Sequence, residues 1–155
     1  ESMMEKFKPK PGQVDYTRAR WAPVMNCVVR HGGKILLVQR SRKLNFYPGY
    51  WNGISGFLDD KRSLVEKVKD ELREEVGIRE KDIKHVRLGR ILHQEAPRYR
   101  KTWIVHPVLV EVRAPRIRLD WEAERHQWVT VRQAPKLKLL PGFKTVLAAV
   151  AQLRP

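Results

Sequence analysis

The chain has 155 residues, and its 32 lysines and arginines against 17 aspartates and glutamates give a formal net charge of +15. Hydrophobic residues make up 42% and charged residues 32%, a balance that excludes a disordered chain and a membrane protein and suits one domain with its own core. The longest apolar runs are too short to span a bilayer and the first residues are charged, so we expect a cytoplasmic protein without a membrane partner.

The first half of the chain predicts an arm followed by strands. Residues 1–20 are polar and rich in turn-forming residues, which predicts a flexible N-terminal arm before a folded domain at 21–155. Two apolar runs, at 23–30 and 34–39, are separated by a His-Gly-Gly turn, the pattern of a β-hairpin. Residues 41–56 are dense in Pro, Gly, Asn and aromatic residues and predict a shaped surface loop.

An amphipathic helix follows this loop. Four aliphatic residues recur at helical spacing: Val65, Val68, Leu72 and Val76. Ser63 and Glu66 form a capping box, in which the hydroxyl and the carboxylate would satisfy backbone N–H groups at the start of the helix. Gly77 occupies the left-handed position that ends many helices.

The second half of the chain predicts further strands and a last helix. Strand-like stretches lie at 86–92, 102–112 and 127–131, and a helical stretch lies at 142–153. Pro107 falls inside the second strand, which predicts an edge position or a β-bulge there because proline has no N–H to donate.

Three carboxylates share one side of the predicted helix. Glu71 and Glu75 stand one turn apart, and Glu74 lies beside them. Like charges at this spacing repel each other unless a cation neutralises them, although a charged helical face is usually just solvated surface. Mg²⁺ or Mn²⁺ prefers carboxylate oxygens, and such ions offset the charge of a diphosphate and activate water for attack on phosphorus.

The stretch Gly56–Ile78 resembles the box of the Nudix family, which reads Gly, five residues, Glu, seven residues, Arg-Glu, an aliphatic residue, any residue, Glu-Glu, any residue, Gly and an aliphatic residue. The positions that match are Gly56, Glu71, Leu72, Glu74, Glu75, Gly77 and Ile78. Arg62 stands where the family has its first Glu, and Asp70 stands where it has Arg. We hypothesise that these two residues form the ion pair of the box with its signs reversed. The resemblance extends to the flanks and covers nearly all of 21–153.

The resemblance implies a fold and a site. The fold would be an α/β/α sandwich around a mixed β-sheet, of the α+β class. Glu71, Glu74, Glu75 and the carbonyl of Gly56 would bind Mg²⁺ or Mn²⁺, and Glu71 or a later carboxylate would deprotonate water. For the later carboxylate we choose Glu95, because family members often supply an extra Glu after the box. The predicted catalytic residues are therefore Glu71, Glu75 and Glu95.

Other residues are weaker or more ambiguous candidates. Glu122 and Glu124 are second choices for the later carboxylate. In the loop before the box, Arg40 would meet a phosphate, and Tyr47 or Trp51 would stack on a base, although a structural aromatic residue under a loop is an equal interpretation. None of the family's substrate signatures is intact.

We therefore expect an Mg²⁺- or Mn²⁺-dependent pyrophosphohydrolase that cleaves a phosphoanhydride bond in a nucleoside diphosphate linked to another moiety. The alternative is a catalytically silent module that binds a nucleotide or RNA through its basic surface, which the altered Arg62 and Asp70 favour. A decapping-like enzyme, in which the basic charge and hydrolysis serve one RNA substrate, is a third and weaker hypothesis. The favoured partner is a small nucleotide rather than RNA, and the resemblance adds the expectation of a homodimer.

Overall fold

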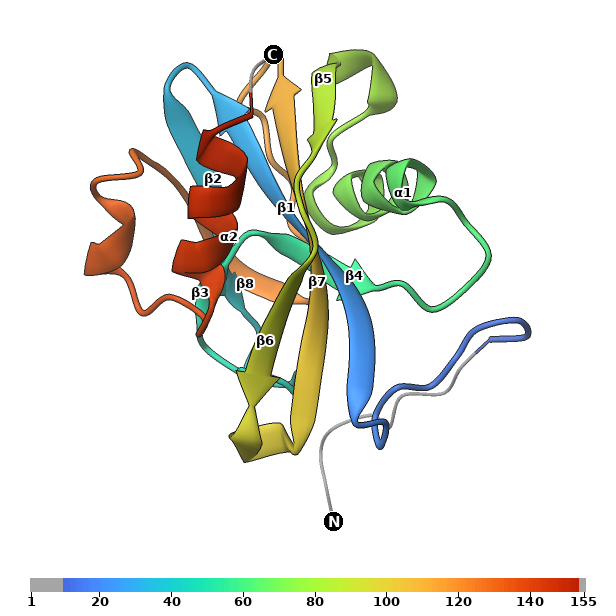
Figure 1. Cartoon of the computed structure of the whole chain (residues 1–155). Helices are drawn as coiled ribbons and strands as arrows, with labels where there is room; N and C mark the ends of the chain where they lie inside the picture. Colours follow the sequence, from blue (N-terminus) through green and yellow to red (C-terminus); the bar gives the residue numbers. More distant parts are fainter. Residues whose placement is uncertain (1–9, 154–155) are drawn as a thin grey trace.

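A computed structural model describes residues 10–153 of the chain, and the elements of this part form a mixed sheet with a helix on each face (Figure 1). The strands are β1 (Trp21–His31), β2 (Lys34–Arg40), β3 (Trp51–Asn52), β4 (Ile54–Phe57), β5 (Ile83–Leu88), β6 (Leu92–Ala96), β7 (Lys101–Val112) and β8 (Ala123–Val129). The α-helices are α1 (Leu64–Val76) and α2 (Phe143–Ala151), and the 3-10 turns are Glu80–Asp82, Pro97–Tyr99 and Ala134–Lys136.

The long strand β1 is the axis of the sheet. It pairs in parallel with β7, from Trp21 opposite Thr102 to Arg30 opposite Glu111. Its other edge is shared by β4 and β2, which both run antiparallel to it, and β2 continues the sheet to β3 and β8. The outer edge of β7 is likewise shared by β5 and β6. One parallel pair among antiparallel pairs makes the sheet mixed, as predicted.

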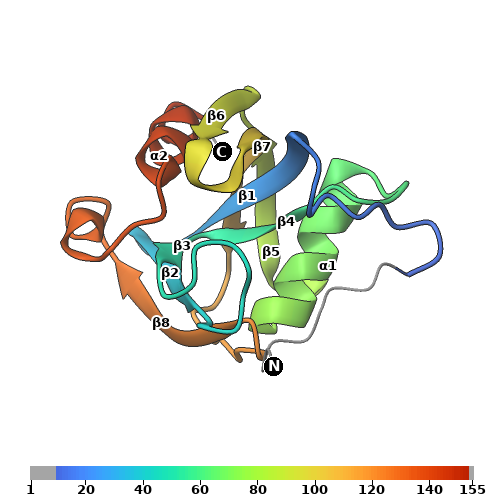
Figure 2. The same cartoon turned by 90° about the horizontal axis from the view of Figure 1, so that it is seen from below.

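The two helices cover opposite faces of the sheet (Figure 2). Under α1, the buried side chains are Met25, Cys27, Val29, Ile54, Val68, Leu72 and Val76, with neighbours from β7. Under α2, they are Phe143, Val146, Leu147 and Val150, with an aromatic group that includes Tyr47 and Trp103. Two separate apolar cores on the two faces confirm the predicted α/β/α sandwich.

The local signals for the hairpin and the box helix are confirmed. Gly32 and Gly33 both have positive φ angles, +56° and +79°, in the turn between β1 and β2. The Ser63 hydroxyl accepts a hydrogen bond from the Glu66 N–H at 3.2 Å and caps α1, which confirms the hydroxyl half of the predicted capping box. Gly77, with φ +70°, ends the helix and donates its N–H to the Arg73 carbonyl.

Two expectations for the second half of the chain are wrong. The stretch 86–92 is not one strand, because the chain breaks at Gly89 between β5 and β6. Pro107 lies inside the sheet rather than at an edge or a bulge, opposite Asn26 of β1. It lies between the segments of β7 that pair with β6 and β5, so no ladder hydrogen bond needs its missing N–H, and its carbonyl accepts from Gly89.

Of the predicted N-terminal arm, residues 1–9 lie outside the described residues, and 10–20 contain turns but no helix or strand. The described part contacts the domain next to the box: Val14 donates its N–H to the Asp59 carbonyl at 2.7 Å, and Tyr16 stacks on Phe57. Among the described residues, no helix has the length and apolar character to cross a membrane.

Candidate functional site

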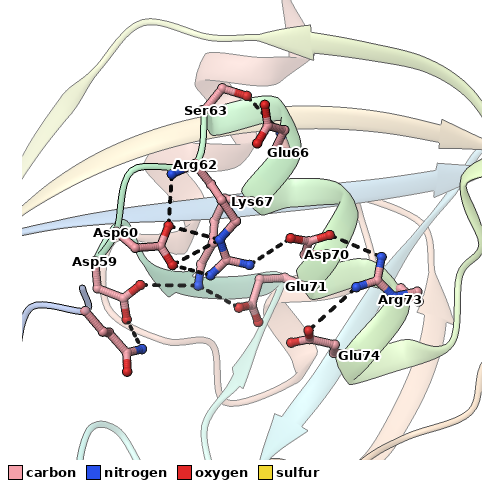
Figure 3. Close-up of polar contacts among 11 residues, drawn as sticks. Asp59, Asp60, Arg62, Ser63, Glu66, Lys67, Asp70, Glu71, Arg73 and Glu74 are labelled. Carbon is pink, nitrogen blue, oxygen red and sulfur yellow. Dashed lines mark hydrogen bonds and ion pairs between the residues drawn. The ribbon is translucent and has the colours of Figure 1, made fainter. Parts of the chain in front are cut away.

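The loop before α1 is fastened to the helix by the two residues that depart from the box pattern. Arg62 Nη1 lies 2.7 Å from Asp70 Oδ2, and Arg62 also contacts the carboxylate of Asp60 (Figure 3). Hydrogen bonds from the Arg62 side chain and backbone lower the pKa of Asp60 to about 2. The hypothesised Arg62–Asp70 ion pair is therefore confirmed as a contact.

Deeper along the helix, an ammonium group lies among carboxylates. Lys67 Nζ lies 2.9 Å from Glu71 Oε1 and 3.5 Å from Asp59 Oδ1, and the Lys67 side chain is only 6% exposed (Figure 3). Burial lowers the pKa of Lys67, but the charges of Glu71 and Asp59 outweigh it and raise the pKa overall, so the amine stays protonated. Sequence reasoning did not predict Lys67 as a site residue, because charged residues between the apolar positions of a helix usually face solvent. Its position four residues before Glu71 was the one indication that the two side chains could pair.

Gly56 brings the backbone of β4 against the Glu71 carboxylate. A Cβ at this position would lie 3.2 Å from Glu71 Cδ and 3.4 Å from Oε1. Any side chain here would crowd the carboxylate, so the first glycine of the box has a steric role at the site.

Glu75 is buried and contacts a carboxylate from far along the chain. Burial, a hydrogen bond with Glu122 and the charge of that group raise the pKa of Glu75 well above its ordinary value. Asp120 donates its N–H to the Glu75 carbonyl at 3.0 Å, which fixes the loop before β8 against the end of α1. This long-range contact brings Glu122 to the box.

Two adjoining hollows surround these carboxylates. An open cleft is lined by Glu71, Glu74 and Glu122, together with Lys67, Arg62 and residues of the N-terminal segment. A smaller pocket is lined by Arg40, Ser55, Glu75, Asp120 and Glu122, with apolar neighbours. Glu122 lines both hollows, so it lies between Glu71 and Glu74 of the cleft and Glu75 of the pocket.

The oxygen donors here have the chemistry of a hard-cation site. They are the carboxylates of Glu71, Glu74 and Glu75 and the nearby Gly56 backbone, and Asp59 adds a buried oxygen, Oδ1, without a hydrogen-bond partner in the structure. Within residues 10–153, no three side chains of the ligand types converge closely enough to hold a metal ion as they stand. The donors fit Mg²⁺ or Mn²⁺ in their chemistry but do not form a ready-made site, and the Lys67 ammonium lies beside Glu71.

The structure does not bring Glu95 to this group. Glu95 lies on β6, where its carboxylate accepts a hydrogen bond from Thr102 Oγ1 of β7 at 2.6 Å, and it lines neither hollow. Glu124 accepts from the Arg42 N–H at 3.1 Å. Of the three later carboxylates that the sequence suggested, Glu122 is the one beside Glu75. Contacts between segments that are far apart in the chain bring it there, so no local sequence pattern could have ranked it above Glu95 and Glu124.

The substrate-binding candidates differ in their placement. Arg40 reaches the small pocket, with its Nε donating to the Phe46 carbonyl at 3.0 Å. Tyr47 and Trp51 are buried, at 7% and 5% exposure. The Tyr47 hydroxyl accepts from Trp103 Nε1, so Tyr47 belongs to the core under α2, and neither ring presents an open face to a base.

Comparisons with known proteins bear on the fold and the family of the chain. The chain is 36% identical over 77 residues to the NAD-capped RNA hydrolase NudC of Chromobacterium violaceum; the match covers 50% of this chain and only 27% of that protein. The NUDIX domain of Shewanella oneidensis NrtR, solved with ADP ribose, superposes with a TM-score of 0.71 at 16% identity, over 85% of this chain and 87% of that one. A NUDIX hydrolase from Nitrosomonas europaea gives 0.69 at 18% identity, over 84% and 88%.

At these identities the two solved structures support the fold alone. The family itself is shown by the NUDIX domain profile, which matches residues 20–150 and so spans the sheet, the box and almost all of α2. The chain belongs to the NUDIX domain family.

Proposed function

We propose that the protein is a pyrophosphohydrolase that cleaves the phosphoanhydride bond of a nucleoside diphosphate linked to another moiety. The observation that carries this proposal is the meeting of Glu71, Glu74 and Glu75 with Glu122 around two adjoining hollows. A purely structural charged helix face would have no reason to bury Glu75 against a second carboxylate, because each buried charge loses its hydration.

Glu71, Glu74 and Glu75 would hold Mg²⁺ or Mn²⁺, with the Gly56 carbonyl as a further donor. When bound, such ions offset the charge of a diphosphate and make a bound water more acidic. The chain's own part is to present oxygen donors from a helix whose start is fixed by Ser63 and whose end is fixed by Gly77.

We assign the removal of the water proton to the Glu122 carboxylate. Glu122 contacts Glu75 and lines both hollows, so one of its oxygens is available to a water held near the box carboxylates. Arg40 lines the same small pocket and provides a fixed positive charge for a phosphate that enters it.

The ligand and substrate named for two of the similar proteins belong to this chemical class. ADP ribose, with which the NrtR domain was solved, and NAD-capped RNA, the substrate named for NudC, both contain a diphosphate that links a nucleoside to another group. The net charge of +15 favours anionic ligands through long-range steering.

The test is product release from ADP-ribose, NAD, nucleoside triphosphates, dinucleoside polyphosphates and NAD-capped RNA, with Mg²⁺ or Mn²⁺. Turnover by the wild type should fall about a hundredfold or more in Glu75→Gln, by analogy with the loss of other central charged groups. Glu80→Gln is the matched control, since Glu80 follows the box and pairs with Lys69 outside the site. Equal activity of Glu75→Gln and the wild type would contradict the proposal.

A second function, ligand binding without hydrolysis, is favoured by the ammonium of Lys67 among the carboxylates and by the reversed Arg62–Asp70 pair. Under this alternative the folded protein binds ADP-ribose or RNA with a salt-sensitive affinity and releases no product with either metal. Equilibrium binding measured beside the turnover assay separates the two functions.

A further inference from the structure

Lys67 is buried on the side of α1 that carries Glu71 and Glu75, one and two turns further along the helix. A buried ammonium is costly unless it is paired, and the ion-pair partners of this one are the carboxylates of Glu71 and Asp59. Its position is therefore set by the same oxygens that would attract a metal ion.

Asp59 provides an independent sign that this cluster is incompletely satisfied. Its Oδ2 accepts a hydrogen bond from Gln13 Nε2 at 2.6 Å, but its Oδ1 is fully buried and has no hydrogen-bond partner among the described residues. Lys67 Nζ faces this oxygen at 3.5 Å, too far for a good hydrogen bond. A carboxylate oxygen left in this state is an available ligand for a cation that enters the cluster.

We infer that Lys67 is an internal cation that competes with the divalent metal for Glu71, so that the free protein binds metal weakly. This inference rests on the metal site of the proposed function and adds a residue that sets its affinity. A metal ion can take Glu71 Oε1 only when the ammonium gives way, because the two positive charges would otherwise stand within a few ångströms of each other in a poorly hydrated site.

The consequence is a site whose metal affinity depends on the other charges present. A bound diphosphate brings negative charge to the cleft that Lys67 also lines, and its oxygens provide a second partner for the displaced ammonium. Substrate and metal are therefore expected to bind more tightly together than separately, and removal of the Lys67 charge should tighten metal binding even without substrate.

The experiment is a titration with Mn²⁺, followed by the electron paramagnetic resonance signal of the free ion, in the absence of any nucleotide. It compares the wild type with Lys67→Met and with the control Lys69→Met. Both lysines lie on α1 and each has an acidic partner, but Lys69 pairs with Glu80 outside the cluster. We expect the Kd for Mn²⁺ to fall about tenfold or more in Lys67→Met and by less than about twofold in Lys69→Met.

The conservative variant Lys67→Arg keeps the positive charge and should keep the weak binding of the wild type. An unchanged or higher Kd for Mn²⁺ in Lys67→Met would overturn the inference. The proposed function would still stand in that case, provided that the wild type binds Mn²⁺ and turns over substrate. Absence of Mn²⁺ binding in both proteins would overturn the inference together with the metal site.

Lys67→Met leaves Glu71 and Asp59 without their cation and is expected to be less stable in EDTA, so its thermal unfolding is measured with and without Mn²⁺. The inference predicts a larger rise of Tm with Mn²⁺ in this variant than in the wild type.

If the variant does not fold, the inference is tested on the wild type by following the NMR signal of the Lys67 ammonium while diamagnetic Mg²⁺ is added. Displacement from Glu71 should shift that signal, and a signal unchanged at saturating Mg²⁺ would overturn the inference.

Discussion

Two groups of charges on and before α1 both pair acidic with basic side chains, with different results. The outer group, Asp60, Arg62, Asp70 and Arg73, lies at the surface, and the side chains of its central pair are 31% and 26% exposed. The inner group, Asp59, Lys67 and Glu71, is buried, with 6% exposure at Lys67. Solvent screens the outer charges, so they mainly hold the loop to the helix, whereas the inner charges act on each other and on any ion that enters.

The largest effect on stability is expected from breaking the inner group. Glu71→Ala leaves the Lys67 ammonium buried with only the more distant Asp59, and we expect the free energy of unfolding in EDTA to fall by about 3 kcal/mol. Replacing both partners, Lys67→Met with Glu71→Ala, should recover part of this loss, because no unpaired ammonium remains although Asp59 stays without its cation. Urea unfolding of the single and double variants measures this, and purely additive losses would show that the two groups are not coupled.

A smaller effect is expected from the outer group. Arg62→Glu places a carboxylate beside Asp60 and Asp70 and should lower the free energy of unfolding by about 1 kcal/mol. Adding Asp70→Arg restores an ion pair in the orientation usual for the family, and we expect it to recover about half of the loss, since Asp60 still repels the new Glu. Equal stability of the single and double variants would mean that the 62–70 pair has no role in holding the loop.

The smallest effect is a dependence on acid at Asp60. The pKa of Asp60 is lowered from 3.8 to about 2, first by the hydrogen bonds of Arg62, so the folded state binds fewer protons than the unfolded state between these values. The stabilisation is present above pH 4 and is lost as the pH falls toward 2. Because the residue is exposed, the gain is less than about 1 kcal/mol.

Unfolding in urea at pH 5 and pH 2.5 tests this dependence. Asp60→Asn should lose less stability than the wild type over this interval, and parallel losses in the two proteins would assign the acid dependence to other groups.

The features predicted from sequence were those carried by local rules. The aliphatic spacing from Val68 to Val76 and the ends at Ser63 and Gly77 defined the box helix, and the glycine pair defined the hairpin. Pro107 was misinterpreted because its tolerance in the sheet depends on where β5 and β6 end, which is a property of the whole sheet.

The part of the site on α1, with Gly56 and Arg40 nearby, was predicted from sequence, whereas the contacts of Glu122 and Lys67 were not. Glu71, Glu74 and Glu75 follow from their spacing, but Glu122 reaches Glu75 through the contact of the loop before β8 with the end of α1. The burial of Lys67 depends on how closely the preceding loop approaches the helix at Asp59. Neither contact is encoded in a short stretch of sequence.

The most direct test of the proposed hydrolase is a comparison of three carboxylate variants on the substrate that the wild type turns over, at saturating Mn²⁺. We predict that kcat falls about a hundredfold or more in Glu75→Gln and Glu122→Gln and stays within about threefold of the wild type in Glu95→Gln. Full activity in Glu122→Gln with a collapse in Glu95→Gln would contradict the role assigned to Glu122, and a folded, metal-loaded wild type that turns over no substrate of the panel would contradict the hydrolase itself.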